Sequence, residues 1–147
     1  CEKNGGFVQD SNPDPNENRY MEIVEEVVKE IYSDFFRIDG GDMPERKVIA
    51  NDQASYHGMA SLKKRKPPLI NERGLKLRNI VCQIYLKKTV FRKTGFYDAL
   101  ATYIHEFCHS FGGDASQSFS FALTLAIEIL MENHTVLQKY KERWECV

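Results

Sequence analysis

The chain has 147 residues, of which 42% are apolar and 28% charged, and its formal net charge is −1 at pH 7. These values are typical of one globular domain and leave too little chain for two. They also exclude a membrane-spanning helix, because the longest apolar run, residues 119–131, is short and contains Glu128.

The first half of the chain predicts a linker followed by a helix. Residues 1–18 are rich in Asn, Asp, Pro and Gly, which predicts a flexible N-terminal linker before a single domain spanning residues 19–147. Between Arg19 and Phe36 apolar residues recur at helical spacing with Glu and Lys between them, so this segment is expected to form an amphipathic helix. The Asp-Gly-Gly-Asp run at residues 39–42 ends it.

The middle of the chain favours β-structure. Strands are expected at Lys47–Ala50, around Ala54–Leu62 and at Asn79–Phe91, where β-branched and aromatic residues are frequent. Pro67-Pro68 and Arg73-Gly74 are expected to form loops between them. The three strands would make a small antiparallel sheet.

Two helices are expected in the last third of the chain. The first runs from Gly95 to Phe111 and ends at Gly112-Gly113. Asp114 reads as the N-cap of the next helix, with Gln117 completing a capping box. The resulting order, helix, small antiparallel sheet, helix, helix, predicts a compact α+β domain.

A possible metal-binding motif lies on the first of these helices. His105 and His109 are four residues apart in the segment HEFCH, so they share one helix face at the rim of the core. Two imidazoles on successive turns can bind one ion, and Glu106, on a neighbouring face, can reach a metal-bound water without binding the metal. This is the H-E-x-x-H pattern of two zinc ligands and a general base.

The motif resembles that of the zincin metallopeptidases. The resemblance covers HEFCH, the preceding strand IVCQIYLKK and the helix that follows, and the element order looks most like the minigluzincins and the ImmA/IrrE-type peptidases. It implies that His105 and His109 bind Zn²⁺ and that Glu106 polarises the attacking water and carries its proton to the leaving amine. It also implies that the strand Ile80–Lys88 pairs with an extended substrate.

The third zinc ligand is open from the sequence. Metzincins carry a Gly three residues after the second His, as Gly112 does here, but their ligand comes at the sixth position, which is Ala115. Asp114, at the fifth, is preferred because a tight Gly-Gly turn keeps it near His109.

Three other residues remain alternatives for the third ligand. Gluzincins use a Glu of the next helix, and Glu128 lies nineteen residues after His109. A hairpin between the helices would carry Glu128 about 21 Å along its own helix, past the metal. His57 and His134 are the remaining candidates.

The predicted function is a zinc-dependent metallopeptidase domain, part of a larger protein, that hydrolyses a peptide bond in a protein partner. A nucleic-acid-binding module is one alternative, because eleven Lys and Arg stand between Ser61 and Lys93 against one acid, Glu72. Aromatic residues are too scattered for a base-stacking platform. SprT-type proteases share HExxH, but their later histidine motif is missing.

A zincin-fold domain that binds without cleaving is a further alternative, and the intact Glu106 argues against it.

The four cysteines predict a reduced, cytoplasmic protein. They form no CxxC pair, and Cys82 and Cys108 lie in apolar segments where a free thiol behaves as a small hydrophobic group. A bridge between Cys1 and Cys146 is the alternative. No secretory leader precedes the domain in this sequence, and no membrane partner is expected.

Overall fold

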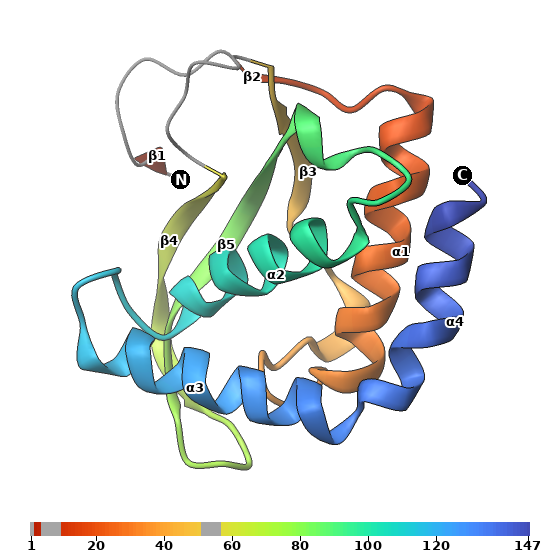
Figure 1. Cartoon of the computed structure of the whole chain (residues 1–147). Helices are drawn as coiled ribbons and strands as arrows, with labels where there is room; N and C mark the ends of the chain where they lie inside the picture. Colours follow the sequence, from red (N-terminus) through yellow and green to blue (C-terminus); the bar gives the residue numbers. More distant parts are fainter. Residues whose placement is uncertain (1, 4–9, 51–56) are drawn as a thin grey trace.

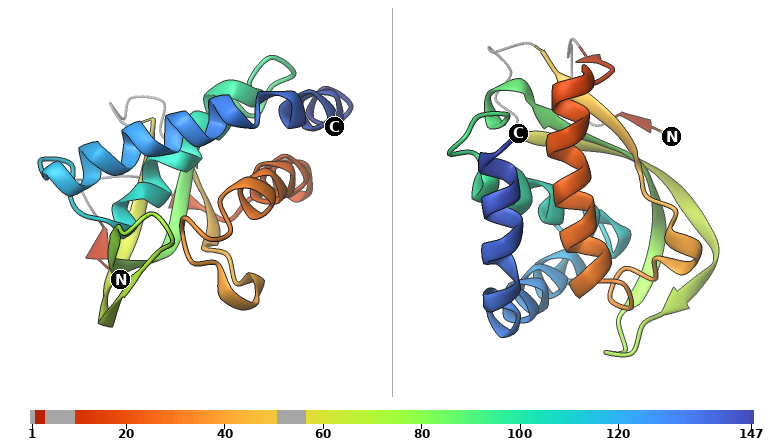
Figure 2. Two further views of the ribbon diagram at one scale, coloured as in Figure 1. Left: turned by 90° about the horizontal axis from the view of Figure 1, so that it is seen from below. Right: turned by 90° about the vertical axis from the view of Figure 1, so that its right-hand side faces the viewer.

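The computed structural model describes residues 2–3, 10–50 and 57–147. In Figures 1 and 2, four α-helices lie on one face of a mixed sheet, which confirms the predicted α+β class. Three strands form the body of the sheet: β3 (Glu45–Ile49), β4 (Gly58–Ile70) and β5 (Lys76–Lys87). The two-residue strands β1 (Glu2–Lys3) and β2 (Asp10–Ser11) pair at opposite edges, giving the order β1-β4-β5-β3-β2.

None of the helices in the described ranges has the length and apolar character needed to cross a membrane.

Helix α1 (Pro15–Ile31) begins before the predicted Arg19, so the end of the predicted linker is helical. Asp14 is its N-cap: the Asp14 carboxylate accepts a hydrogen bond from the Glu17 amide at 2.7 Å, and the Glu17 carboxylate accepts one from the Asp14 amide at 3.0 Å. This reciprocal capping box, with Pro15 at the first helical position, satisfies amides that would otherwise lack partners.

The sheet is mixed, so the predicted purely antiparallel sheet is wrong. β4 and β5 form an antiparallel hairpin, but β5 lies between β4 and β3 and runs parallel to β3. Residues Gln83–Leu86 of β5 therefore pair on both edges. For Gln83–Leu86 this central position contradicts the expectation that the strand Ile80–Lys88 pairs with a substrate, because the backbone groups of these four residues are already used on both edges.

The hairpin is longer than predicted. β4 continues through Pro67-Pro68, which were expected in a loop, and the connection to β5 follows Ile70. The pairing with β5 is irregular between Lys64 and Leu69, where the prolines lie. Proline has no amide hydrogen to donate, so it is tolerated at such an interruption of the ladder.

Helix α2 (Phe96–Phe107) crosses the sheet and continues into a 3₁₀ turn, η3 (Cys108–Ser110), in place of the single helix predicted to Phe111. Four apolar residues of this segment recur in the sequence at the spacing of one helix face, which predicts that they point inward, and all four are buried: Leu100, Ile104, Phe107 and Phe111. This face contacts an aromatic cluster at the end of α1, in which the Phe36 ring stacks on Phe107 with centroids 4.2 Å apart.

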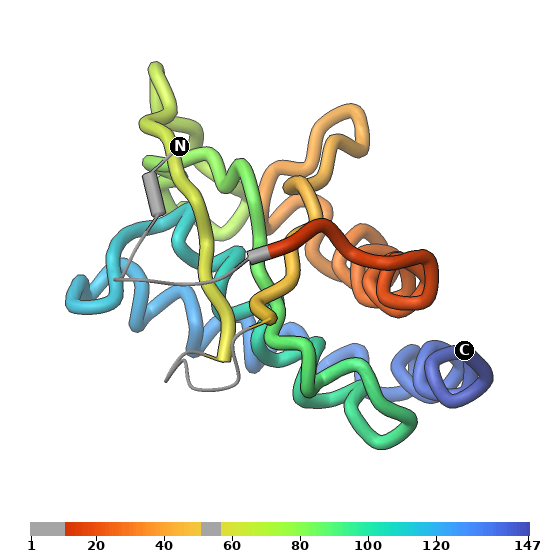
Figure 3. Tube along the Cα trace, turned by 90° about the horizontal axis from the view of Figure 1, so that it is seen from above, coloured from red at the N-terminus to blue at the C-terminus, as the bar shows by residue number. Residues whose placement is uncertain are grey.

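Helices α3 (Gln117–Glu132) and α4 (His134–Glu145) complete the chain. Ser116, and not Asp114, caps α3: its hydroxyl accepts a hydrogen bond from the Phe119 amide at 3.1 Å. The predicted cap was two residues early because the turn after Gly112-Gly113 is longer than expected. Figure 3 shows α1 and α4 side by side, with the β4–β5 hairpin projecting on the far side of the molecule.

The two remaining short elements are the 3₁₀ turns η1 (Asp39–Gly41) and η2 (Lys88–Val90).

The cysteines differ in part from the prediction. Cys108 is a buried free thiol as expected, and Cys146 is also free, which excludes a bridge from Cys146. Cys82 is disulfide-bonded, although it was expected to be reduced. Disulfides are typical of oxidising compartments, so the cysteines no longer support the cytoplasmic expectation.

Candidate metal centre

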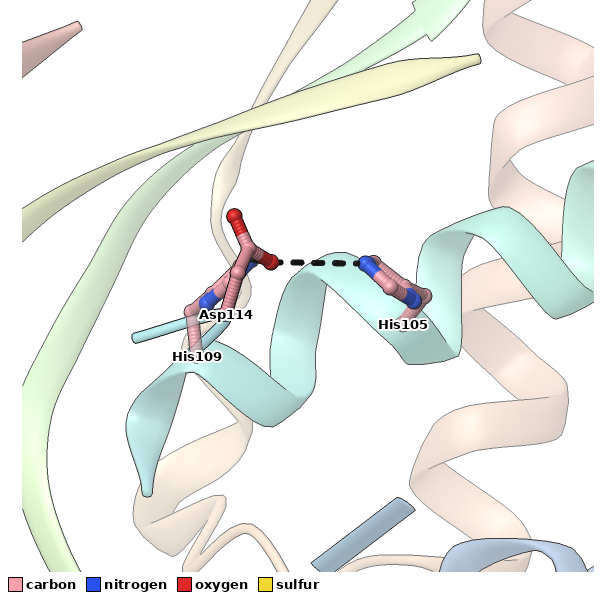
Figure 4. A group of neighbouring side chains, drawn as sticks. All are labelled: His105, His109 and Asp114. Atoms are coloured by element: carbon pink, nitrogen blue, oxygen red, sulfur yellow. Dashed lines mark ion pairs between the residues drawn. The ribbon is translucent and has the colours of Figure 1, made fainter. Parts of the chain in front are cut away.

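Three candidate ligand side chains converge at the end of α2. His105 comes from the last turn of the helix, His109 from η3 and Asp114 from the loop before α3. One ligand atom from each lies within 4.8 Å of the others, so the group could hold a metal ion. The Asp114 Oδ1 atom lies 3.2 Å from His109 Nε2 and 3.8 Å from His105 Nε2. In Figure 4 the carboxylate and both rings point toward one another.

The 3₁₀ turn fixes the orientation of His109. Its Nδ1 lies 3.1 Å from the Gly112 carbonyl oxygen, which can only accept a hydrogen bond, so Nδ1 carries the proton. Nε2, the other ring nitrogen, lies on the side of Asp114, at 3.2 Å from its Oδ1 atom. An imidazole held through its second nitrogen in this way is typical of metal-binding histidines.

A phenylalanine from α3 packs against both imidazoles. Phe119 is buried, stacks on the His109 ring at 4.5 Å and meets the His105 ring edge-on at 5.0 Å. These contacts restrict the ring positions, and they join the start of α3 to the candidate ligands.

Glu106 lies beside the same nitrogen atoms. Its Oε1 is 3.7 Å from His109 Nε2 and its Oε2 is 4.0 Å from His105 Nε2. The side chain is buried, and this burial, assisted by the negative charge of Asp114, raises the pKa of Glu106 to about 7. A carboxyl group with that pKa can both accept and release a proton near neutral pH.

His105 is more exposed than His109 and lies toward the open side of the group. Burial and the neighbouring His109 lower the pKa of His105, while the Asp114 carboxylate acts in the opposite direction. The net lowering favours the neutral imidazole, which is the form that binds metals.

An open cleft of about 750 Å³ contains the group. One wall is the exposed face of α2, including Ala101 and Thr102, and the other is the start of β4 at Gly58–Ala60. A Cβ atom at Gly58 would lie 2.6 Å from the Thr102 methyl carbon and 2.8 Å from the Tyr85 carbonyl oxygen. Glycine is therefore required for β4 to pass this close to α2.

Of the four candidates for the third ligand, one lies beside His105 and His109 in the structure. Asp114 lies with the two histidines, whereas Glu128 is on an exposed face of α3 and does not belong to the group. His134 begins α4, where its Nδ1 lies 2.9 Å from the Met131 carbonyl oxygen. His57 lines the same cleft but is not one of the three grouped residues.

The contributions of Phe119, Gly58 and the Gly112 carbonyl oxygen were not identified from the sequence. In the sequence Phe119 is simply the first residue of the apolar run 119–131, and nothing local distinguishes Gly58 from a turn glycine. Their roles depend on contacts between elements far apart in the chain.

Comparison of the chain with protein-family models, with curated proteins and with solved structures found no match.

Proposed function

We propose that the domain is a zinc-dependent metallopeptidase, in which His105, His109 and Asp114 hold Zn²⁺ and Glu106 is the general base. The observation that carries the proposal is the convergence of these four side chains at one place in an open cleft. Two histidines and one carboxylate, with a fourth position left for water, are typical ligands of catalytic zinc.

Bound zinc would lower the pKa of a water molecule and polarise a carbonyl group. In this proposal Glu106 takes the proton of the attacking water and delivers it to the leaving amine. The two carboxylate oxygens of Glu106 lie within 4.0 Å of the Nε2 atoms of His105 and His109. They are therefore close enough to contact a water molecule that sits beside these nitrogens in the cleft. His109 is held by Gly112, and Phe119 limits the movement of both rings.

The substrate in this proposal lies along β4 and not along β5. Gly58–Ala60 line the cleft opposite α2. Their pairing with β5 uses one edge of the strand, and β1 pairs with the other edge at Ser61 and Leu62. An extended peptide at Gly58–Ala60 would add a strand beside the candidate metal centre.

The nucleic-acid-binding alternative has less support, because the basic segment 61–93 is divided in space. Lys88 and Arg92 follow β5 at one end, whereas Lys63–Lys66 and Arg73 lie toward the hairpin at the other. The 12 residues of β5 separate the two ends by roughly 40 Å.

Several of these cations already have partners within the chain, which further weakens the alternative. Three ion pairs engage them: Lys88 with Glu17 at 3.4 Å, Arg92 with Asp98 at 3.8 Å, and Arg73 with Glu132 at 3.6 Å.

The test is cleavage of a mixed peptide library by the zinc-loaded protein, read by mass spectrometry, with Glu106→Gln as the variant. The substitution keeps the size of the side chain and removes the proton acceptor, so we expect cleavage to fall by roughly 10²-fold or more with zinc content unchanged. Glu145→Gln, an exposed residue at the end of α4, is the matched control and should cleave as wild type.

Equal cleavage by wild type and Glu106→Gln would contradict the proposal. If neither protein cleaves and both bind zinc, the non-cleaving alternative is correct. A protein that binds DNA with a steep salt dependence and takes up no zinc would support the nucleic-acid-binding alternative.

A further inference from the structure

Helix α3 presents an apolar outer face. Three large apolar side chains on it are more than half exposed: Phe121 at 59%, Ile127 at 54% and Met131 at 69%. Figure 2 (left) shows α3 at the outer side of the molecule, away from the sheet. With about 150–200 Å² per side chain, the three expose roughly 300–350 Å² in total, which is within the range of about 300–600 Å² found for the largest apolar patch of a monomer, a patch that is often functional.

The two ends of this face carry opposite charges. Lys76 and Arg78 lie beside Phe121, because all three line one small cavity near the first half of α3. Glu128 and Glu132 lie in the second half. Glu128 is seven residues after Phe121, so it falls on nearly the same line along the helix, about 10 Å further on.

Two of these four charges have no partner in the part of the chain that the structure describes. Arg78 donates to the Phe111 carbonyl oxygen at 3.2 Å and to the Ser118 hydroxyl at 3.3 Å. Glu132 pairs with Arg73 at 3.6 Å. The side chains of Lys76 and Glu128 are both exposed, and the described residues provide neither side chain with a hydrogen bond or an ion pair.

We propose that the outer face of α3 is a docking surface for a second copy of this chain, packed antiparallel about a two-fold axis near Thr124. An antiparallel two-fold pair brings each flank of a helix against the same flank of its partner, with the ends reversed. Lys76 of one copy then meets Glu128 of the other, twice per dimer, while the apolar side chains cover one another.

The surface is self-complementary, which distinguishes this occupant from a partner of other chemistry. A uniformly charged partner would meet a like charge at one end of the helix, whereas a second copy meets an opposite charge at both. The apolar patches of two copies bury roughly 650 Å², and the polar residues around them bring the total toward the lower limit of specific interfaces. The dimer is therefore expected to be weak, with a dissociation constant of about 1–100 μM.

The dimer surface lies away from the candidate metal centre. Phe119, which contacts His105 and His109, points to the buried side of α3, opposite Thr124. Substitutions on the outer face should consequently leave the metal centre and the core unchanged.

The test is sedimentation velocity of the purified chain between 5 and 200 μM (about the range in which such an interface forms). Wild type should shift from the 17.0 kDa monomer toward twice that mass. Ile127→Ser should raise the dissociation constant by roughly tenfold or more. Tyr97→Ser is the matched control, because Tyr97 is 54% exposed on α2, outside this face, and it should leave the constant unchanged.

A charge exchange tests the orientation of the two copies. Lys76→Glu and Glu128→Lys should each weaken the dimer by about three- to tenfold, and the double variant should restore it. Wild type that stays monomeric at 200 μM (about the upper limit of the expected range), or a double variant weaker than either single one, would overturn the proposal. Circular dichroism of each variant identifies any loss of fold.

Discussion

Two glutamates are buried to nearly the same degree in different surroundings. Glu25 on α1 is 6% exposed and Glu106 on α2 is 7% exposed. The Arg46 guanidinium donates two hydrogen bonds to Glu25, each 2.7 Å long. Among the described residues, Glu106 faces the imidazoles of His105 and His109 and the Asp114 carboxylate.

The difference separates a structural carboxylate from a candidate reactive one. A buried carboxylate is costly unless it is paired, and the two-point contact with Arg46 offsets that cost for Glu25. In the described ranges no Lys or Arg pairs with Glu106, and its burial instead raises its pKa. The ion pair between Glu25 and Arg46 holds α1 against β3. Glu106, in contrast, is a carboxyl group in the cleft that can take up a proton near neutral pH.

Replacing each glutamate by glutamine should change the free energy of unfolding by different amounts. Glu25→Gln leaves the Arg46 charge, whose side chain is 30% exposed, with its hydrogen bonds to Asn18 but without a carboxylate, so we expect the free energy of unfolding to fall by about 2–3 kcal/mol. Glu106→Gln removes a buried carboxylate that has no cation, so the metal-free protein should be within about 1 kcal/mol of wild type or more stable. Urea unfolding of both variants after chelation measures the two values.

Equal destabilisation by the two changes would contradict this comparison, because it would mean that Glu106 also stabilises the fold.

The parts of the fold that depend on local pattern could be predicted from the sequence. The apolar stripe through Leu100 and Phe111 identified the buried face of α2, and the spacing of His105 and His109 placed them on one side of it. Burial of such a face follows from its helical period alone.

Features that depend on several competing local signals were predicted less well. Asp14 and Glu17 form the same kind of capping box that was sought at Asp114, but the composition of residues 1–18 favoured a linker. At α3, Ser116 and Asp114 are both good caps, and only the length of the turn decides between them.

Features set by long-range arrangement could not be predicted. The parallel pairing of β3 with β5 depends on β5 entering between β3 and β4. The close approach at Gly58 depends on how α2 lies across β4. Neither leaves a local signal in the sequence.

Asp114 supplies a smaller test of the candidate centre. Asp114→Ala should lower zinc affinity by at least about tenfold, because it removes the carboxylate that lies 3.2 Å from His109. Glu128→Ala should stay close to wild type, since Glu128 is outside the group. Competition with a fluorescent chelator measures both, and the reverse ranking would show that Glu128 is the ligand.

The most direct test of the proposed function is the zinc content of the purified, reconstituted chain, measured by inductively coupled plasma mass spectrometry. Wild type should hold close to one equivalent after dialysis. His109→Ala removes the proposed ligand atom Nε2 together with the Nδ1 atom that contacts the Gly112 carbonyl oxygen, so it should hold almost none while keeping its helical circular dichroism. Wild type that retains no zinc, or a His109→Ala variant that retains a full equivalent, would contradict the assignment of His105, His109 and Asp114 as a zinc site.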